Sequence, residues 1–236
     1  MTPTPAVVSH TPISLIRGIA ALMYLVIAGL ISSILVIPLV VFGGRRNRTQ
    51  HFVERLWASG VLKIAGIRVV VKGRENLPKD GCVIVANHRS NADVLSIMGG
   101  AATPARFIAK AELKWVFFIS IGMSMTGHIF VRRGKRKSGG KALGEAAKEL
   151  RKGAWVLLFP EGTRVKTDQS LPWKSGAFRL AIDAQVPMVP AVIHHARRLW
   201  PSEALIPRPG TMVVEFLPSI PTEGLVIKQH PHLRNQ

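Results

Sequence analysis

The longest apolar stretch of the chain predicts a membrane helix near the amino terminus. Residues 18–44, GIAALMYLVIAGLISSILVIPLVVFGG, carry no charged side chain. A straight helix of this length would extend about 40 Å, enough to cross the roughly 30 Å hydrocarbon core of a bilayer. Pro38 is expected to kink or end the helix, because proline lacks the backbone donor. A cleaved signal peptide fits poorly, since the run is too long and a basic RRNR follows it.

Basic residues on both sides of this run predict its orientation. Arg17 precedes it, and three arginines follow it, Arg45, Arg46 and Arg48. Positively charged flanks stay on the cytoplasmic side. We therefore expect the rest of the chain to form a domain on the cytoplasmic side of the cell inner membrane. The sequence is compatible both with an anchor that spans the bilayer and with a helical hairpin that enters one leaflet.

The next segment, RTQHFVERLWASGVLKIAG (residues 48–66), has a second helical pattern. Its apolar positions follow i, i+4 spacing, with basic residues on the other side: Phe52, Val53, Leu56, Trp57 and Val61. This pattern favours an amphipathic helix on a membrane surface. A helix packed on the core of the following domain would show the same periodicity. Residues 1–65 are thus expected to form a membrane-anchoring helical segment, and residues 66–236 a separate domain.

Beyond residue 66 the pattern changes to short β-branched runs. Seven of them are expected to be strands: 67–73, 81–87, 105–109, 127–133, 154–160, 186–193 and 211–217. Helical patterns lie between several of these, for example at 139–153. This alternation predicts an α/β domain with a largely parallel or mixed sheet flanked by helices. Ligands bind at the carboxyl ends of such strands, where three polar clusters stand here.

Composition adds a constraint on partners. The 236 residues contain 32 basic and 13 acidic side chains, a net charge of +19. A surface of this charge favours anionic partners, such as phospholipid head groups, phosphorylated metabolites or an acidic carrier protein. Nucleic acid would also be anionic, but aromatic residues are only 6% and no nucleic-acid-binding motif occurs. The single cysteine, Cys82, excludes an intrachain disulfide and fits a reducing compartment.

The first polar cluster, NHRSNAD, ends the second expected strand and allows two interpretations. In one, Ser90 and Asp93 form the S-x-x-D capping box of a new helix. In the other, His88 is a general base and Asp93 orients its ring. The two side chains can meet only if His88 lies in the turn and Asp93 in the first helical turn, so both interpretations are compatible. Ser90 as a nucleophile is less well placed, only two residues from His88.

The other two clusters end later strands. GHIFVRR places Arg133 directly after a strand, where its guanidinium could hold a phosphate; the basic residues after it would otherwise form a solvated loop. FPEGTR, residues 159–164, is either a solvent turn or a site that gathers a carboxylate, a hydroxyl and a guanidinium. No cluster of histidines, carboxylates or the cysteine has the spacing of a metal site, so no metal is expected.

In this order the clusters resemble the glycerolipid acyltransferases, specifically the 1-acylglycerol-3-phosphate (lysophosphatidate) acyltransferase family. NHRSNAD is similar to the family's N-H-x-S-x-x-D motif, GHIFVRR to its second motif, and FPEGTR to its third, letter for letter. VPMVP at 186–190 is similar to the fourth. The resemblance covers roughly residues 66–217. One departure is Arg132, since the family commonly has an acidic residue before the arginine of the second motif.

The resemblance implies a reaction and a role for each motif residue. A fatty acyl group would move from an acyl thioester, acyl-CoA or acyl-carrier protein, to the sn-2 hydroxyl of 1-acylglycerol-3-phosphate, giving phosphatidate. His88 and Asp93 would be catalytic, and no cofactor is implied beyond the acyl donor. The substrate-binding residues would be Arg133, Glu161, Gly162, Thr163, Arg164 and Pro190. Arg133 and Arg164 would hold the phosphate, Glu161 would orient the acceptor or an arginine, and Pro190 would line the acyl end.

Because of Arg132, the acceptor could also be another lysolipid, such as a lyso-ornithine lipid or a lysophospholipid with a larger head group. Two classes of non-enzyme are disfavoured by the four ordered motifs. One is a membrane-tethered nucleic-acid binder, and the other is a structural lipid-binding protein.

Overall fold

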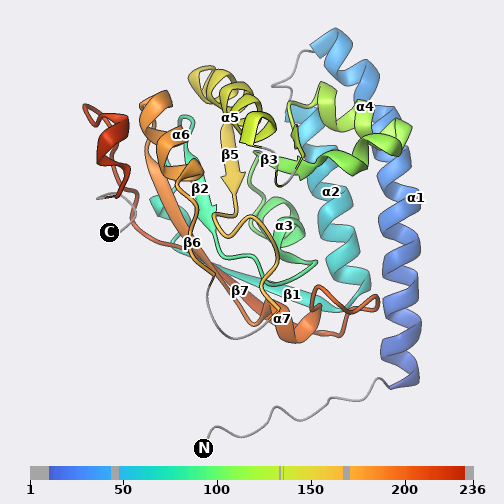
Figure 1. The fold of residues 1–236 in the computed structure, drawn as a ribbon. Helices are drawn as coiled ribbons and strands as arrows, with labels where there is room; N and C mark the ends of the chain where they lie inside the picture. Colours follow the sequence, from blue (N-terminus) through green and yellow to red (C-terminus); the bar gives the residue numbers. More distant parts are fainter. Residues whose placement is uncertain (1–10, 44–47, 133, 135, 167–170, 232–236) are drawn as a thin grey trace, which may run out of the picture.

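A long apolar helix stands beside an α/β body (Figure 1). The computed structural model describes residues 11–43, 48–132, 134, 136–166 and 171–231. Helix α1 (Pro12–Gly43) is the one helix in these ranges that is long and apolar enough to cross a membrane, and only 11% of its most apolar window is buried. The expectation that Pro38 could end the helix is wrong, because α1 continues to Gly43. Figure 1 shows the last part of α1 turned away from the axis of the rest, as expected where proline removes one helical hydrogen bond.

Helix α2 (Arg48–Ile64) packs between α1 and the sheet. Ala58, Val61 and Leu62 are buried in the core. This face of α2 confirms the alternative of a helix packed on the domain, whereas Phe52 and Leu56 stay exposed, at 61% and 55%. The apolar face of α2 therefore packs mainly against the protein core, and a few of its apolar residues are exposed on the surface. The anchor segment and the α/β body share one hydrophobic core.

The sheet has seven strands in the order β1-β7-β6-β2-β5-β3-β4. The seven expected strands are all present, as β1 (Ile67–Lys72), β2 (Val83–Ala86), β3 (Ala105–Lys110), β4 (Ile129–Val131), β5 (Trp155–Leu158), β6 (Met188–His194) and β7 (Gly210–Phe216). All neighbouring pairs are parallel except β6 and β7, which are antiparallel. The prediction of a largely parallel, mixed sheet is confirmed.

Helices cover both faces of the sheet. They are η1 (Arg74–Asn76), α3 (Asp93–Leu95), η2 (Ser96–Gly100), η3 (Ala111–Trp115), α4 (Phe117–Met125), α5 (Arg136–Arg151), α6 (Gly176–Ala184), α7 (Ala196–Leu199) and η4 (Ile227–Gln229). The central strand β2 is buried throughout, and its side chains alternate between two cores. Ile84 joins the core with α1 and α2, and Val83 and Val85 join the core with α5 and α6. This explains why β2 reads as a continuous apolar run.

The register of the parallel strands fixes which residues meet at the carboxyl edge. Val85 of β2, Leu158 of β5, Ile108 of β3 and Ile129 of β4 form one row across the sheet. Three positions further along each strand direction stand His88, Glu161, Ala111 and Arg132. These four residues therefore follow the carboxyl ends of four neighbouring strands. The polar clusters of the sequence lie at this edge because each follows the carboxyl end of one of these parallel strands.

Candidate active site

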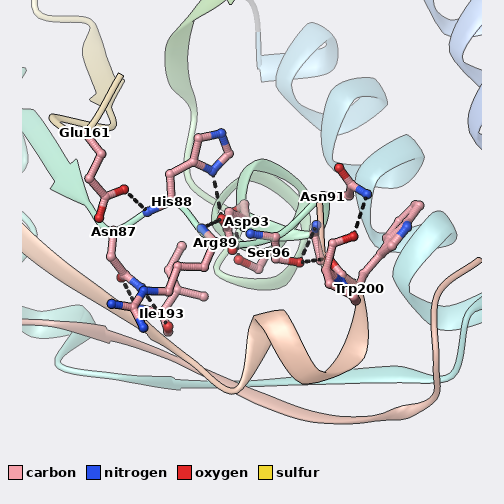
Figure 2. A network of polar contacts seen from close by, with 12 residues as sticks. Asn87, His88, Arg89, Asn91, Asp93, Ser96, Glu161, Ile193 and Trp200 are labelled. Carbon is pink, nitrogen blue, oxygen red and sulfur yellow. Dashed lines mark hydrogen bonds and ion pairs between the residues drawn. The ribbon is translucent and has the colours of Figure 1, made fainter. Parts of the chain in front are cut away.

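His88 and Asp93 form a buried pair in the turn between β2 and α3 (Figure 2). The His88 Nδ1 to Asp93 Oδ2 distance is 2.8 Å, and the side chain of Asp93 has no exposed surface. Asp93 is the first residue of α3, and His88 precedes the helix. The pair can form because the chain turns between them rather than continuing as one helix.

The same carboxylate oxygen also organises the backbone of the turn. Asp93 Oδ2 accepts hydrogen bonds from the N–H groups of Arg89, at 2.7 Å, and Ser90, at 2.8 Å. The bond from Ser90 N–H is the half of the capping box that the sequence predicts. Ser90 Oγ instead donates to Trp200 O and accepts from Ala92 N–H. Half of the capping box is thus present beside the His88–Asp93 contact, the general-base role of His88 stays a prediction, and Ser90 Oγ bonds to backbone groups.

The imidazole of His88 is held by packing as well as by Asp93. It stacks on Phe159, with ring centroids 3.9 Å apart and an interplanar angle of 17°. Because Nδ1 faces Asp93, Nε2 lies on the other side of the ring, and Figure 2 shows it pointing away from the carboxylate. A donated Nδ1–H would leave a lone pair on Nε2 for a substrate proton.

The FPEGTR turn after β5, with the next residue Val165, forms hydrogen bonds to both backbone groups of His88. Glu161 Oε2 accepts the His88 N–H at 2.7 Å, and the Val165 N–H donates to His88 O at 2.8 Å. Glu161 is only 4% exposed, and this burial raises the pKa of its carboxyl, against the lowering effect of the His88 N–H bond. Thr163 and Arg164 lie at the exposed side of the turn. Of the predicted substrate-binding residues, Glu161 thus contacts His88 directly, and Gly162, Thr163 and Arg164 follow it in the same turn.

Gly162 allows the turn to have this shape. Its φ is +71°, a left-handed conformation that favours glycine. A Cβ at this position would lie 2.5 Å from the ammonium nitrogen of Lys174. The Lys174 N–H donates to Pro160 O at 2.9 Å, so the chain just before α6 contacts the FPEGTR turn.

Pro190 is not brought to this cluster. It pairs with Val85 in the middle of the sheet, and Ile193 of the same strand lies at the level of His88. Three residues of strand separate the two levels, about 10 Å. The carbonyl of Pro190 accepts from Leu217 N–H at 2.9 Å, so its missing donor faces the end of the β6–β7 ladder. Arg133, the other predicted phosphate ligand, lies outside the described residues.

Several contacts of the site were not foreseen as such. Asn87 exchanges two hydrogen bonds with the backbone of Ile193, at 2.7 and 3.0 Å, and ties the end of β2 to β6. Asn87 belongs to NHRSNAD and Phe159 to FPEGTR, so the sequence contained a signal for these two residues, whereas Lys174 lies in none of the four motifs. The contact with Trp200 has no local signal, since 110 residues separate it from Ser90. Within the described ranges no group of three or more histidine, cysteine or acidic residues could hold a metal ion.

Comparisons with known proteins place this geometry in a family. Residues 68–194 match the family model described as Acyltransferase. The chain is 34% identical over 195 residues to the 1-acyl-sn-glycerol-3-phosphate acyltransferase of Pseudomonas aeruginosa, covering 81% of this chain and 74% of that protein. It is 34% identical over 209 residues to the human 1-acyl-sn-glycerol-3-phosphate acyltransferase alpha, covering 86% and 72%.

The fold has a counterpart among solved structures. The crystal structure of the 1-acyl-sn-glycerophosphate (LPA) acyltransferase from Thermotoga maritima matches with a TM-score of 0.72 and 24% identity. The match covers 93% of this chain and 94% of that one, so it extends beyond the α/β body to most of the chain.

Proposed function

The chain belongs to the acyltransferase family, and on that premise we propose that it acylates the sn-2 hydroxyl of 1-acylglycerol-3-phosphate to give phosphatidate. The acyl donor is an acyl thioester, acyl-CoA or acyl-carrier protein. The observation that carries the proposal is the buried His88–Asp93 pair with Nε2 directed away from the carboxylate. The names of the relatives from Pseudomonas aeruginosa and human support the choice of acceptor.

His88 acts as the general base on the acceptor. An alcohol is a poor nucleophile at neutral pH, so Nε2 takes the proton of the sn-2 hydroxyl while its oxygen attacks the thioester carbonyl. The tetrahedral intermediate then collapses, the C–S bond breaks, and Nε2 returns the proton to the departing thiolate. Asp93 fixes the Nδ1–H tautomer and stabilises the transient imidazolium. The acceptor attacks directly, so no serine or cysteine nucleophile takes part.

Glu161 acts on His88 as a positioning residue. Its described bond is to the His88 backbone N–H, not to an arginine side chain. Together with Val165 it holds the peptide on both sides of His88, which keeps the ring in place against Phe159. The expectation that Glu161 orients the acceptor stays a prediction.

Cations at the exposed side of the turn hold the acceptor phosphate in this proposal. Arg164 is exposed and directly precedes Val165, whose N–H donates to His88 O. Arg133 is proposed as a second ligand from its motif alone. Thr163 and the backbone at Gly162 belong to the same turn and would contact the acceptor beside Arg164. Pro190 would contact only a part of the acyl donor that reaches the middle of the sheet.

The long helix α1 suits this chemistry. Acceptor and product are both lipids, so a site held at a membrane acts on them without extraction into water. The arginines that follow α1 and the net charge of +19 favour an anionic cytoplasmic leaflet. We place the α/β body on the cytoplasmic side of the cell inner membrane.

The test uses the full chain in detergent–lipid micelles with lysophosphatidate and labelled acyl-CoA. His88→Ala should fold normally and form no phosphatidate. The matched control is His194→Ala, because His194 also pairs with a carboxylate, Glu215 at 3.0 Å, outside the site. Equal turnover by His88→Ala and wild type would rule out the general-base role. No turnover by wild type with either acyl-CoA or acyl-carrier protein would reject the reaction.

Another lysolipid is the second candidate acceptor, because Arg132, which stands where the family commonly has an acidic residue, is exposed after β4. An added cation there favours a lysolipid with more negative charge and disfavours one with a cationic head group. Competition between lysophosphatidate, a lyso-ornithine lipid and a lysophospholipid with a larger head group, at equal concentrations, decides between them. Preference for either of the last two would replace lysophosphatidate as the acceptor.

A further inference from the structure

A buried charged cluster joins helix α2 to the start of the edge strand β4, apart from the turn that holds His88. Its centre is Glu54 of α2. Glu54 Oε2 lies 3.5 Å from a guanidinium nitrogen of Arg106 in β3, and Glu54 Oε1 lies 3.4 Å from Nε2 of His128, the residue before β4. Arg106 and His128 are only 3% and 6% exposed. Buried charges are costly unless they are paired, and the side chains of this cluster pair with one another.

The imidazole of His128 connects this cluster to the sheet. Its Nδ1 accepts the N–H of Phe107 at 3.2 Å, so the proton of the neutral ring is on Nε2, the nitrogen that faces Glu54. Burial lowers the pKa of His128, against the raising effect of Glu54, which keeps the ring neutral. Burial would raise the pKa of Glu54, but the contacts with His128 and His51 lower it overall, so this carboxyl is ionised. Glu54 therefore selects the tautomer in which Nδ1 can accept a hydrogen bond.

The strand that follows His128 is the shortest of the sheet. It has three residues, Ile129–Val131, and pairs with β3 alone, starting with Ile129 opposite Ile108. Phe107 stands one position before this first pair, so the His128 side chain adds a further bond at the start of the ladder. The rings of Phe107 and His128 also pack together, with centroids 4.2 Å apart. Three residues provide few side chains to specify the register of a strand, and His128 fixes the point at which β4 begins to pair.

The turn before β4 is held by the same cluster. Gly127, between α4 and β4, has φ +86°, a left-handed conformation that favours glycine. A Cβ at this position would lie 3.3 Å from Arg106 Nε, which is a tight contact. The backbone of the turn therefore lies close against the Arg106 side chain, and both Arg106 and His128 hold the start of β4.

The start of β4 determines where its carboxyl end lies. His128 and Arg132 are four residues apart in the second motif, about 13 Å of extended strand. Arg132 is exposed after β4, and Arg133, the second ligand proposed for the acceptor phosphate, follows it in the chain. A slip of β4 by one residue would move this end by about 3.3 Å and reverse the faces of its side chains. A charge-assisted hydrogen bond to a phosphate, about 2.8 Å long, would not survive such a shift.

We propose that His128 is a positioning residue for binding of the acceptor. Its bond to Phe107, made possible by the tautomer that Glu54 selects, sets the register of β4 and thereby places the arginine of the second motif for the acceptor phosphate. The inference rests on the proposed function, which assigns that arginine to that phosphate. β5 and β3 separate β4 from β2, the strand that precedes His88. The register of β4 should therefore affect binding of the acceptor and leave the chemical step at His88 unchanged.

Two amide variants separate the contacts of the two ring nitrogens. The amide oxygen of His128→Asn occupies nearly the position of Nδ1 and can still accept the Phe107 N–H. The amide of His128→Gln occupies nearly the position of Nε2, so it reaches Glu54 and loses the bond to Phe107. The matched control is His51→Gln, because His51 also faces Glu54, at 3.4 Å, but belongs to α2. The assay uses the full chain in micelles and measures kcat and KM for lysophosphatidate at a saturating concentration of the donor that wild type uses.

His128→Gln should raise KM for lysophosphatidate by about tenfold, as expected when a charge-assisted phosphate contact is lost, and kcat should stay within about threefold of wild type. His128→Asn should restore the KM of wild type, and His51→Gln should not change it. Three results would each overturn the proposal. They are an unchanged KM in His128→Gln, an equal rise of KM in both amide variants, and a fall of kcat at constant KM, which is what a merely structural cluster would give.

Two further measurements need no turnover. Calorimetry with 1-palmitoyl-1,3-propanediol 3-phosphate, which lacks the sn-2 hydroxyl, reports binding of the acceptor alone. If wild type formed no phosphatidate but bound this analogue about tenfold more tightly than His128→Gln does, the positioning role would stand and the proposed reaction would fail. If His128→Gln did not fold, ¹⁵N NMR of the histidine rings of wild type would decide. An unprotonated Nδ1 on His128 would support the proposal, and a protonated Nδ1 would overturn it.

Discussion

Replacing Asp93 by asparagine removes one buried charge and leaves the shape of the side chain nearly unchanged. Asp93 Oδ2 accepts from the Arg89 and Ser90 N–H groups and faces His88 Nδ1 at 2.8 Å. An amide oxygen can still accept from the two backbone groups, so the turn should keep its form. Asp93→Asn cannot supply a negative charge beside the imidazolium that the proposed mechanism forms on His88.

The size of the loss follows from the distance. Two unit charges 2.8 Å apart interact by about 6 kcal/mol at an effective dielectric constant near 20. At about 1.4 kcal/mol for each factor of ten, this corresponds to roughly four orders of magnitude in rate. Relaxation around the site reduces it, and we expect kcat to fall by about 10³- to 10⁴-fold. KM for the donor and the acceptor should change little, because Asp93 does not reach either.

The assay measures kcat and both KM values in micelles, with thermal unfolding recorded for each protein. Asp183→Asn is the matched control, since Asp183 pairs with Arg151 at 3.1 Å on the surface and its loss should leave kcat unchanged. A folded Asp93→Asn protein with kcat within about tenfold of wild type would refute the reasoning, because the electrostatic contribution would then be several kcal/mol smaller than the distance requires.

Three other changes test the surroundings of the site. Gly162→Ala should lower stability by about 1–2 kcal/mol, because a Cβ strains the left-handed turn and meets Lys174. Gly144→Ala in α5, where a Cβ meets nothing within 4 Å, should stabilise the fold by up to about 1 kcal/mol. Midpoints of thermal unfolding equal to that of wild type in both variants would contradict both expectations. Burial raises the pKa of Glu161 above its ordinary 4.5, so the folded state holds this proton more tightly than the unfolded state. Wild type should therefore lose stability relative to Glu161→Gln as pH rises from 4.5 through the raised pKa, and parallel stability curves would show that no such shift exists. Burial also raises the pKa of the Cys82 thiol to about 12, so iodoacetamide at pH 8 should alkylate it only after unfolding; rapid labelling of the folded chain, read by mass spectrometry, would be inconsistent with its burial.

The sequence was most informative where structure depends on neighbouring residues. The seven strands follow from β-branched runs between turn residues, and His88 meets Asp93 because both belong to one turn and the helix start that follows it. Glu161 reaches His88 because β2 and β5 are parallel neighbours, and the FPEGTR motif alone could not show which peptide it would bind. The path of α2 also required tertiary information, since the same periodicity suits a membrane surface and a protein core.

The position of Pro190 shows what a motif does not contain. The residues around Pro190 predict that it lies in a strand. The distance of Pro190 from the carboxyl edge, however, depends on the register of β6 against β2. Register is set by packing across the whole sheet, and a shift of one residue moves every side chain of the strand to the opposite face. A residue of a motif can therefore lie about 10 Å from the site that the other motifs form.

The two hydrogen bonds that hold the His88 peptide, from Glu161 and Val165, connect the base to a segment that is synthesised more than 70 residues later. Asn87 likewise depends on Ile193, 106 residues further on. A nascent chain that has emerged only as far as α3 therefore has His88 and Asp93 but lacks the groups that hold the His88 peptide. On the proposed mechanism, acyl transfer requires that nearly the whole α/β body has been synthesised and folded. On that mechanism, activity would report on a completed chain.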